Sequence, residues 1–144
     1  MKRNKKIKIL IIEDEINTIR AAIHELKKRN NTVVDHVAFM EDAENLLKSQ
    51  LYNLIIVDAR IPSNKQDKLV EEGGLELMSK LTNSELGTIN INTKYIILSS
   101  QAHSLRSESE VLHENCKGLF PKLLYSVYMN FISDFLDKEN IDNE

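Results

Sequence analysis

The chain has 144 residues, of which 42% are hydrophobic and 28% are charged, and its formal net charge is −3 with a pI of about 5.8. These values are typical of a globular protein, and they exclude a disordered or fibrous chain and a strongly basic nucleic-acid-binding domain. No apolar run approaches the roughly 20 residues that a membrane-spanning helix needs.

The length fits one domain. We expect that domain to span residues 1–144, with a core from about residue 7 to residue 137 and a polar tail at 138–144. Cys116 is the only cysteine and no secretory signal is present, so we expect a cytoplasmic protein. The basic start is interpreted as a solvated leader, and neither nucleic acid nor membrane is an expected partner. It comprises Lys2, Arg3, Lys5, Lys6 and Lys8.

Apolar runs and helical stripes alternate along the chain, which predicts β-α-β units and an α/β fold. In chain order we expect a strand at Ile7–Ile12, a helix at Ile16–Leu26, a strand at Val33–Val37, a helix around Ala43–Leu47, a strand at Leu54–Val57, a helix at Leu75–Leu81 after Gly73–Gly74, a strand at Tyr95–Leu98, a weaker helix near Leu105–Glu114, a strand at Leu119–Phe120 and a helix near Leu123–Asp137.

Three of the expected strands, the first, third and fourth, are continuously apolar, which is typical of strands buried on both faces. With right-handed crossovers, the pattern predicts a doubly wound, five-stranded parallel sheet flanked by five helices. Such sheets bind ligands at the carboxyl ends of their strands.

Two connections, Pro62–Gly74 and Asn83–Lys94, are long for a domain of this size.

Acidic residues end two of the expected strands. Glu13 and Asp14 follow the first, and Asp58 ends the third. If those strands are neighbours, the carboxylates meet at one edge of the sheet and repel one another unless a cation compensates. Hard oxygen ligands without nitrogen or sulfur indicate Mg²⁺.

A hydroxyl and an ammonium group follow the remaining strands at the same edge. Ser99 ends the fourth strand, and Lys122 follows the fifth. Together with a metal ion, these donors can neutralise the oxygens of a phosphoryl group. The set therefore predicts phosphoryl transfer onto a nucleophilic aspartate, Asp58.

Four segments resemble the signatures of response-regulator receiver domains, in the family's order and over nearly the whole chain. They are Ile9–Glu15, Leu54–Pro62, Ile96–Ser100 and Gly118–Lys122. The resemblance is to the stand-alone, single-domain type, and it implies a flavodoxin-like receiver fold.

The resemblance also implies a role for each site residue. Asp58 is the expected phosphoacceptor. Asp14 is expected to bind Mg²⁺ directly, Glu13 to bind it directly or through water, and the backbone carbonyl of Arg60 to supply a further ligand. Ser99 and Lys122 match the residues that bind the phosphoryl group. The metal ligands implied are Glu13, Asp14, Asp58 and Arg60, and the catalytic set is Asp58, Ser99 and Lys122.

The sequence departs from the family's pattern in two places. The stretch from Pro62 to Gly74 is longer than usual, which favours a tolerated surface insertion but leaves open a contact with one partner or a shield over the site. The usually aromatic position three residues before the lysine is Leu119. Phe120 beside it is expected to face the other side of the sheet.

We expect a signalling module that catalyses only its own phosphorylation and dephosphorylation, and that receives its phosphoryl group from a sensor histidine kinase or a histidine phosphotransfer protein. No output segment is expected after the last helix, so the signal should pass to a protein partner by contact. The last helix is more apolar than one buried face requires, so a homodimer through it is an open alternative.

Two other functions remain as alternatives. One is a receiver-like scaffold that is never phosphorylated. The other is a flavodoxin-like binder or a phosphatase. A flavin phosphate is disfavoured because the loop after the first strand, Glu13–Glu15, would repel it in the absence of a metal ion. A phosphatase with a nucleophilic aspartate is disfavoured because Asp58–Arg60 contains no second acid.

Overall fold

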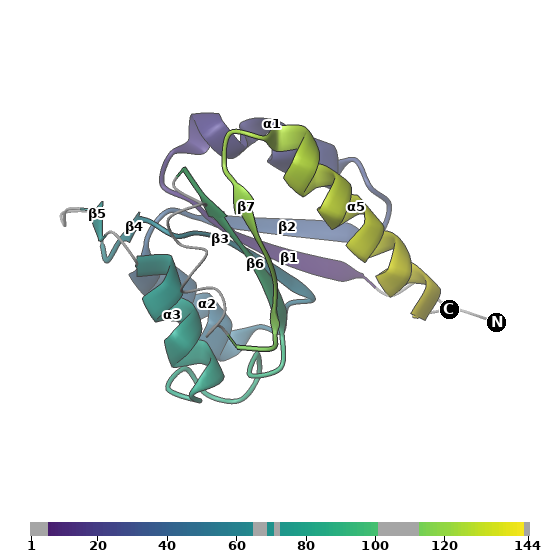
Figure 1. Cartoon of the computed structure of the whole chain (residues 1–144). Helices are drawn as coiled ribbons and strands as arrows, with labels where there is room; N and C mark the ends of the chain where they lie inside the picture. Colours follow the sequence, from purple (N-terminus) through teal and green to yellow (C-terminus); the bar gives the residue numbers. More distant parts are fainter. Residues whose placement is uncertain (1–5, 65–68, 71–72, 101–112, 143–144) are drawn as a thin grey trace.

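The computed structural model describes residues 6–64, 69–70, 73–100 and 113–142. Five strands form one parallel sheet in the order β2-β1-β3-β6-β7 (Figure 1). They are β1 (Ile7–Ile12), β2 (Thr32–Val37), β3 (Leu54–Asp58), β6 (Lys94–Ser99) and β7 (Cys116–Pro121).

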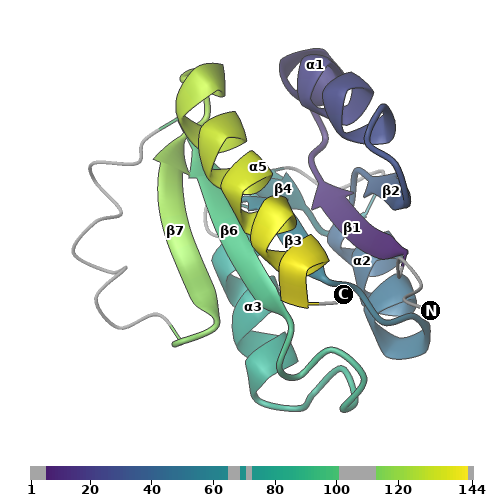
Figure 2. The same cartoon turned by 90° about the vertical axis from the view of Figure 1, so that its right-hand side faces the viewer.

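Helices cover both faces of this sheet, as Figure 1 and Figure 2 show. One face carries α1 (Ile16–Lys27) and α5 (Tyr125–Asp142), and the other carries α2 (Met40–Ser49) and α3 (Gly73–Thr82). This arrangement confirms the predicted doubly wound α/β sheet. Four helices are described where five were predicted, because the predicted helix near Leu105–Glu114 lies outside the described residues apart from its last two positions.

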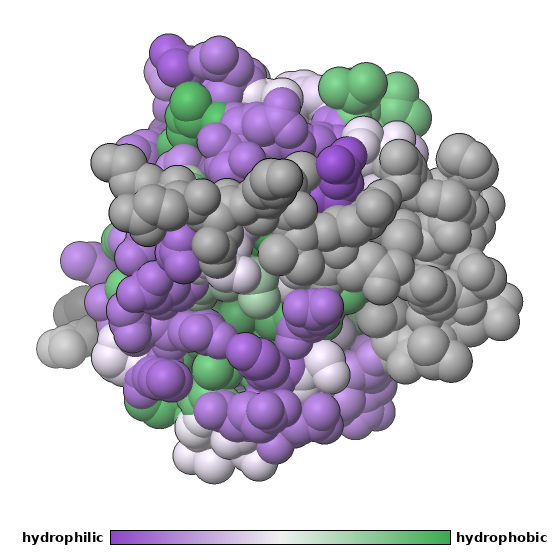
Figure 3. Space-filling model, turned by 90° about the vertical axis from the view of Figure 1, so that its left-hand side faces the viewer, coloured by the Kyte–Doolittle hydropathy of each residue, from purple (hydrophilic) through white to green (hydrophobic). Residues whose placement is uncertain are grey.

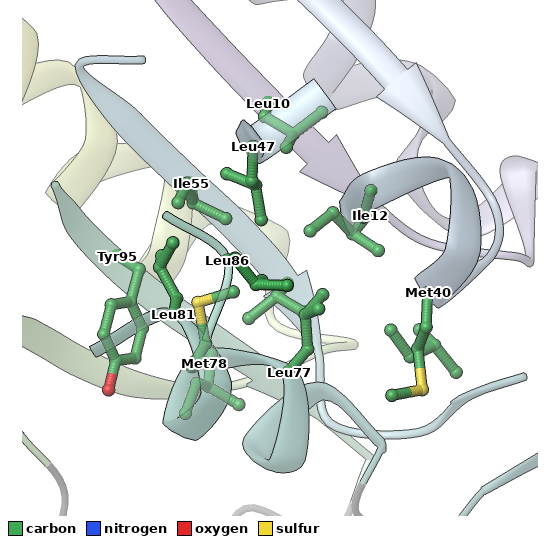
Figure 4. Packing of buried hydrophobic residues seen from close by; sticks show 14 of the residues in the cluster. Leu10, Ile12, Met40, Leu47, Ile55, Leu77, Met78, Leu81, Leu86 and Tyr95 are labelled. Atoms are coloured by element: carbon green, nitrogen blue, oxygen red, sulfur yellow. The ribbon is translucent and has the colours of Figure 1, made fainter. Parts of the chain in front are cut away.

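The side chains of β1 alternate between the two faces, which explains why its sequence is apolar throughout. Leu10 and Ile12 pack into the cluster under α2 and α3, whereas Ile9 and Ile11 pack into the cluster under α1 and α5. Figure 4 shows the first cluster, with side chains from the sheet and from both helices pointing into one apolar layer. Burying each such side chain contributes about 1.5–3 kcal/mol, so the two layers hold the helices against the sheet.

Two elements extend beyond their predicted bounds. β7 begins at Cys116, earlier than the predicted Leu119, because Lys117 and Gly118 interrupt the apolar run on a strand at the edge of the sheet. α5 begins at Tyr125 and continues to Asp142, so the predicted polar tail is helical over most of its length. The apolar stripe ends near Leu136, but nothing in the polar sequence after it breaks a helix.

Among the described helices, none has both the length and the apolar character required to cross a bilayer.

The long connection after β3 contains a small antiparallel ribbon rather than an irregular loop. Its strands are β4 (Ile61–Pro62) and β5 (Leu69–Val70). The ribbon starts three residues after Asp58, and the amide of Glu41 in α2 donates a 3.0 Å hydrogen bond to the carbonyl of Ser63. The insertion is therefore tied to the body of the domain at its near end.

A fully buried asparagine fixes the other long connection. The side-chain amide of Asn90 donates to the carbonyls of Leu47 and Gln50, at 2.9 and 2.6 Å. Its Oδ1 accepts 2.9 Å hydrogen bonds from the amide of Tyr52 and the hydroxyl of Thr93. This network joins the end of α2 to the starts of β3 and β6, at the sheet edge opposite Asp58.

Candidate functional site

The strand register brings the chemically active residues to one edge of the sheet. Ile12 pairs with Val57, so Glu13 and Asp58 follow at the same level on adjacent strands. Ser99, at the end of β6, pairs with Pro121, which places Lys122 directly after it. In the sheet, β1 lies between β2 and β3. The chain leaves β1 through α1 on one face and leaves β2 through α2 on the other face. The carboxyl ends of β1 and β3 therefore form a topological switch point, where sheets of this kind bind ligands.

Four carboxylates converge at this edge. Glu13, Asp14, Glu15 and Asp58 each offer one oxygen, and these four oxygens all lie within 4.8 Å of one another. Glu13 and Asp58 are buried, Asp14 is half-buried and Glu15 is exposed. The predicted ligands Glu13, Asp14 and Asp58 are thus brought together, and Glu15 is an addition that the sequence analysis did not assign.

Lys122 supplies positive charge to this acidic group. Its Nζ lies 2.6 Å from Glu13 Oε1, 2.7 Å from Asp58 Oδ2 and 3.2 Å from Glu15 Oε1. The lysine is itself buried. The contacts to Glu15 and Asp58 are hydrogen bonds, and the contact to Glu13 is an ion pair.

The backbone holds the site residues in place. The amide of Lys122 donates to the carbonyl of Ser99 at 2.8 Å, which ties the end of β7 to the end of β6. The amide of Arg60 donates to Asp58 Oδ1 at 3.0 Å, so both oxygens of Asp58 accept a hydrogen bond. Ser99 is buried at the predicted position. The predicted role of the Arg60 carbonyl stays a prediction.

Gly74 allows α3 to begin directly against Asp58. A Cβ atom at this position would lie 2.0 Å from the carbonyl oxygen of Asp58 and 3.0 Å from a side-chain carbon of Val57. The Gly74 amide also donates to the Ala59 carbonyl at 2.9 Å. The sequence analysis used this glycine only to mark a helix start, and the structure shows that it sets the distance between α3 and the site.

Further polar residues position Glu13. Thr18 donates its hydroxyl to Glu13 Oε1 at 3.1 Å, and the amide of Glu15 reaches the same oxygen at 3.2 Å. His36 Nε2 lies 2.8 Å from the Glu13 carbonyl. Neither Thr18 nor His36 was predicted. The only sequence signal for Thr18 is its place one helical turn after the acidic run.

Burial, together with the negative charge of Asp58, raises the pKa of Glu13 to about 9, and the hydrogen bond and charge of Lys122 offset only part of this rise. Burial also raises the pKa of Asp14, and the charges of Asp58 and Glu15 add to the effect. Burial opposes the charge on Lys122, but its bonds to Asp58 and Glu13 raise the pKa of the lysine above its ordinary value. The site thus carries more negative charge than one lysine can balance.

These residues fit a hard divalent cation. Asp14 Oδ1 is buried yet has no hydrogen-bond partner within the described part of the chain. A buried carboxylate oxygen is costly without a partner, and a bound cation would provide one. The group found among the described residues offers carboxylate oxygens and includes no histidine or cysteine, which is the donor set that Mg²⁺ prefers.

No protein-family model matches the sequence, and the search of curated proteins gave no match. Solved structures do match. The receiver domain of a Francisella response regulator is 18% identical with a TM-score of 0.68, over 93% of this chain and 99% of that chain. A response regulator of Thermotoga maritima, in complex with Mg²⁺ and BeF, is 20% identical with a TM-score of 0.67, over 90% and 98%.

The receiver domain of a Pseudomonas aeruginosa sensor histidine kinase, with a magnesium ion coordinated in its active-site cleft, is 19% identical with a TM-score of 0.63, over 88% of this chain and 93% of that chain. This chain has the receiver fold. The resemblance expected from the four sequence segments is therefore confirmed at the level of structure, and the receiver fold places Asp58 at the carboxyl end of the central strand β3.

Proposed function

We propose that this chain is a phospho-accepting receiver domain of a two-component or phosphorelay system, and that Asp58 takes the phosphoryl group. The observation that carries the proposal is the contact between Lys122 and the buried Asp58, inside a group of four converging carboxylates. The receiver fold supports the proposal because this group lies at the strand ends where such sheets bind ligands.

In the proposed reaction, a carboxylate oxygen of Asp58 attacks the phosphorus of a phosphohistidine donor. A P–O bond forms, the P–N bond of the donor breaks, and its electron pair returns to the imidazole nitrogen of the donor. Asp58 is held for this attack by the Arg60 amide on Oδ1 and by Lys122 on Oδ2. Lys122 and Ser99 are the residues that would bind the transferred phosphoryl oxygens.

Glu13, Asp14 and Asp58, with the carbonyl of Arg60, would hold a Mg²⁺ ion, which would supply positive charge to the phosphoryl oxygens. The buried, unpaired Oδ1 of Asp14 supports its place in this set. The protein would act on itself alone, with a sensor histidine kinase or a histidine phosphotransfer protein as the phosphoryl donor.

Contact with a partner protein, such as the phosphohistidine donor, is supported by an exposed apolar patch beside the site. We define the entry patch of α5 as Leu123, Leu124 and Val127, whose exposed fractions are 80%, 51% and 45%. The inner side of the same helix is buried through Tyr128, Ile132 and Leu136. The exposed apolar residues thus lie just before α5 and in its first turn. Figure 3 looks onto the carboxyl edge of the sheet, where the described residues are mainly hydrophilic.

Incubation with acetyl phosphate and Mg²⁺, followed by intact-mass measurement, tests the proposal. We expect one phosphoryl group on the wild-type protein and on Asp42→Asn, an exposed aspartate of α2 that serves as the matched control. Asp58→Asn should gain none. A wild-type protein that gains no phosphoryl mass from acetyl phosphate or from a phosphohistidine donor would favour the unphosphorylated scaffold instead.

A further inference from the structure

Lys122 has three carboxylate partners, and their side chains differ in solvent exposure. The side chains of Glu13 and Asp58 are 3% and 5% exposed, whereas that of Glu15 is 62% exposed. In the unphosphorylated, metal-free protein, releasing Glu13 or Asp58 from Lys122 would leave a buried polar group without its partner, which is costly. Releasing Glu15 returns its carboxylate to water, and exposed ion pairs contribute little to stability. Glu15 is therefore the partner that Lys122 can exchange most easily.

The position of Glu15 supports a role beyond helix capping. Glu15 is the N-cap residue of α1, yet its side chain makes no capping hydrogen bond. Its carboxylate is directed instead to Lys122, a residue 107 positions away in the sequence. A shorter Asp, Asn, Ser or Thr is the usual choice where a side chain caps a helix. The longer glutamate reaches across from α1 to the residue after β7.

We infer that Glu15 is a positioning residue that occupies the third N–H donor of Lys122 until an incoming phosphoryl group replaces it. This inference rests on the proposed function, because it requires Lys122 to bind a phosphoryl oxygen. Three carboxylate oxygens already lie within 3.2 Å of Lys122 Nζ, so a phosphoryl oxygen that binds there must displace one of them. Glu15 is the partner displaced, and its negative charge also opposes the approach of an anionic donor.

Both effects act in the same direction. Removing the charge of Glu15 frees one donor of Lys122 and removes repulsion toward the phosphoryl donor. The Glu15→Gln variant should therefore be phosphorylated faster than wild type by acetyl phosphate, and it should bind beryllofluoride more tightly. We expect a gain of roughly twofold to fivefold, the size expected for one exposed ion pair. A bound Mg²⁺ ion does not require Glu15, since Glu13, Asp14 and Asp58 remain.

The test measures the second-order rate constant for phosphorylation by acetyl phosphate at saturating Mg²⁺, and beryllofluoride affinity by calorimetry. Glu44→Gln is the matched control, because Glu44 pairs with Lys80 at the same 3.2 Å distance on α2 and α3, outside the site. It should behave as wild type. Glu15→Asp keeps the negative charge but shortens the side chain that reaches Lys122, so its rate should fall between those of Glu15→Gln and wild type. The gain in Glu15→Gln should shrink in 1 M salt, because exposed charges are screened.

An unchanged rate constant and an unchanged beryllofluoride affinity in Glu15→Gln, with wild type labelled at Asp58, would overturn the inference and leave the proposed function standing. A slower reaction with weaker Mg²⁺ binding would also overturn it, because Glu15 would then be a metal ligand. If wild type itself accepts no phosphoryl group, the proposed function fails first and the role of Glu15 fails with it.

Discussion

Lys122 Nζ lies 2.7 Å from Asp58 Oδ2, and both side chains are buried although the residues are 64 positions apart. The contact joins the residue after β7 to the last residue of β3 across the intervening strand β6. Lys122 therefore has two tasks in the unphosphorylated protein. It balances the charge of buried carboxylates, and it holds an ammonium group where a phosphoryl oxygen would arrive.

The first prediction concerns stability. Lys122→Ala should lower the free energy of unfolding by about 3 kcal/mol in EDTA, because it leaves the buried carboxylate of Asp58 without a counter-charge and Glu13 without its buried partner. Mg²⁺ should restore part of the loss. Urea denaturation measures both effects. Lys80→Ala removes a more exposed lysine–glutamate pair and should cost about 1 kcal/mol or less. Equal losses in the two variants would contradict the structural role of Lys122.

The second prediction concerns pH. The pKa of Glu13 is about 9 in the folded protein and 4.5 ordinarily, so between these values the folded chain holds a proton that the unfolded chain has lost. Stability must then fall as pH rises through this window, because the folded state binds more protons. In EDTA, the melting temperature should decrease from pH 6 to pH 8.5. Glu13→Gln should flatten that decrease, and a slope that persists in this variant would assign it to another group.

The third prediction concerns Gly74. A helical Gly→Ala change usually stabilises a protein slightly. Here the added methyl group would meet the Asp58 carbonyl oxygen at 2.0 Å, so α3 must move away from β3. We expect Gly74→Ala to lose about 1–3 kcal/mol and to be phosphorylated more slowly. Ser79→Ala, an exposed position on the same helix, is the control. A variant as stable and as reactive as wild type would show that α3 is not fixed by this contact.

The fourth prediction concerns the entry patch of α5. Leu123→Ser should slow phosphotransfer from a phosphohistidine protein that labels the wild type, while labelling by acetyl phosphate stays unchanged, since only a protein donor needs an apolar surface around Asp58. Leu51→Ser is the matched control, because Leu51 is 64% exposed and lies at the opposite edge of the sheet. Equal phosphotransfer rates for the two variants would place the donor on a different surface.

Much of the fold followed from local sequence pattern. Continuous apolar runs such as Leu54–Val57 are typical of strands buried on both faces, and they predicted the parallel sheet and the edge where Asp58, Ser99 and Lys122 meet. Leu119 and Phe120 face opposite sides as predicted. Leu119 packs toward α2 and α3, and the ring of Phe120 lies 5.1 Å from that of Phe131 in α5.

Features that depend on tertiary contacts were not predictable. The ribbon of β4 and β5 has only two residues in each strand, too few for a pattern to show. Glu15 stands in a position that usually caps a helix, and only the three-dimensional path of α1 brings it to Lys122. From the sequence, Lys122 was predicted to bind only the phosphoryl group. Its pairing with Glu13 could not be predicted, because it depends on the burial of both side chains in the folded protein.

The network around Asn90 fixes the amino ends of β3 and β6, while the residues proposed to react lie at their carboxyl ends. The two ends of the sheet should therefore differ in how readily they open. The Tyr52 amide is bound to the buried Oδ1 of Asn90, so its hydrogen should exchange with deuterium only when most of the domain unfolds. Backbone hydrogens near Lys122 should exchange through smaller, local openings, which would leave the reactive edge free to rearrange on a fixed base.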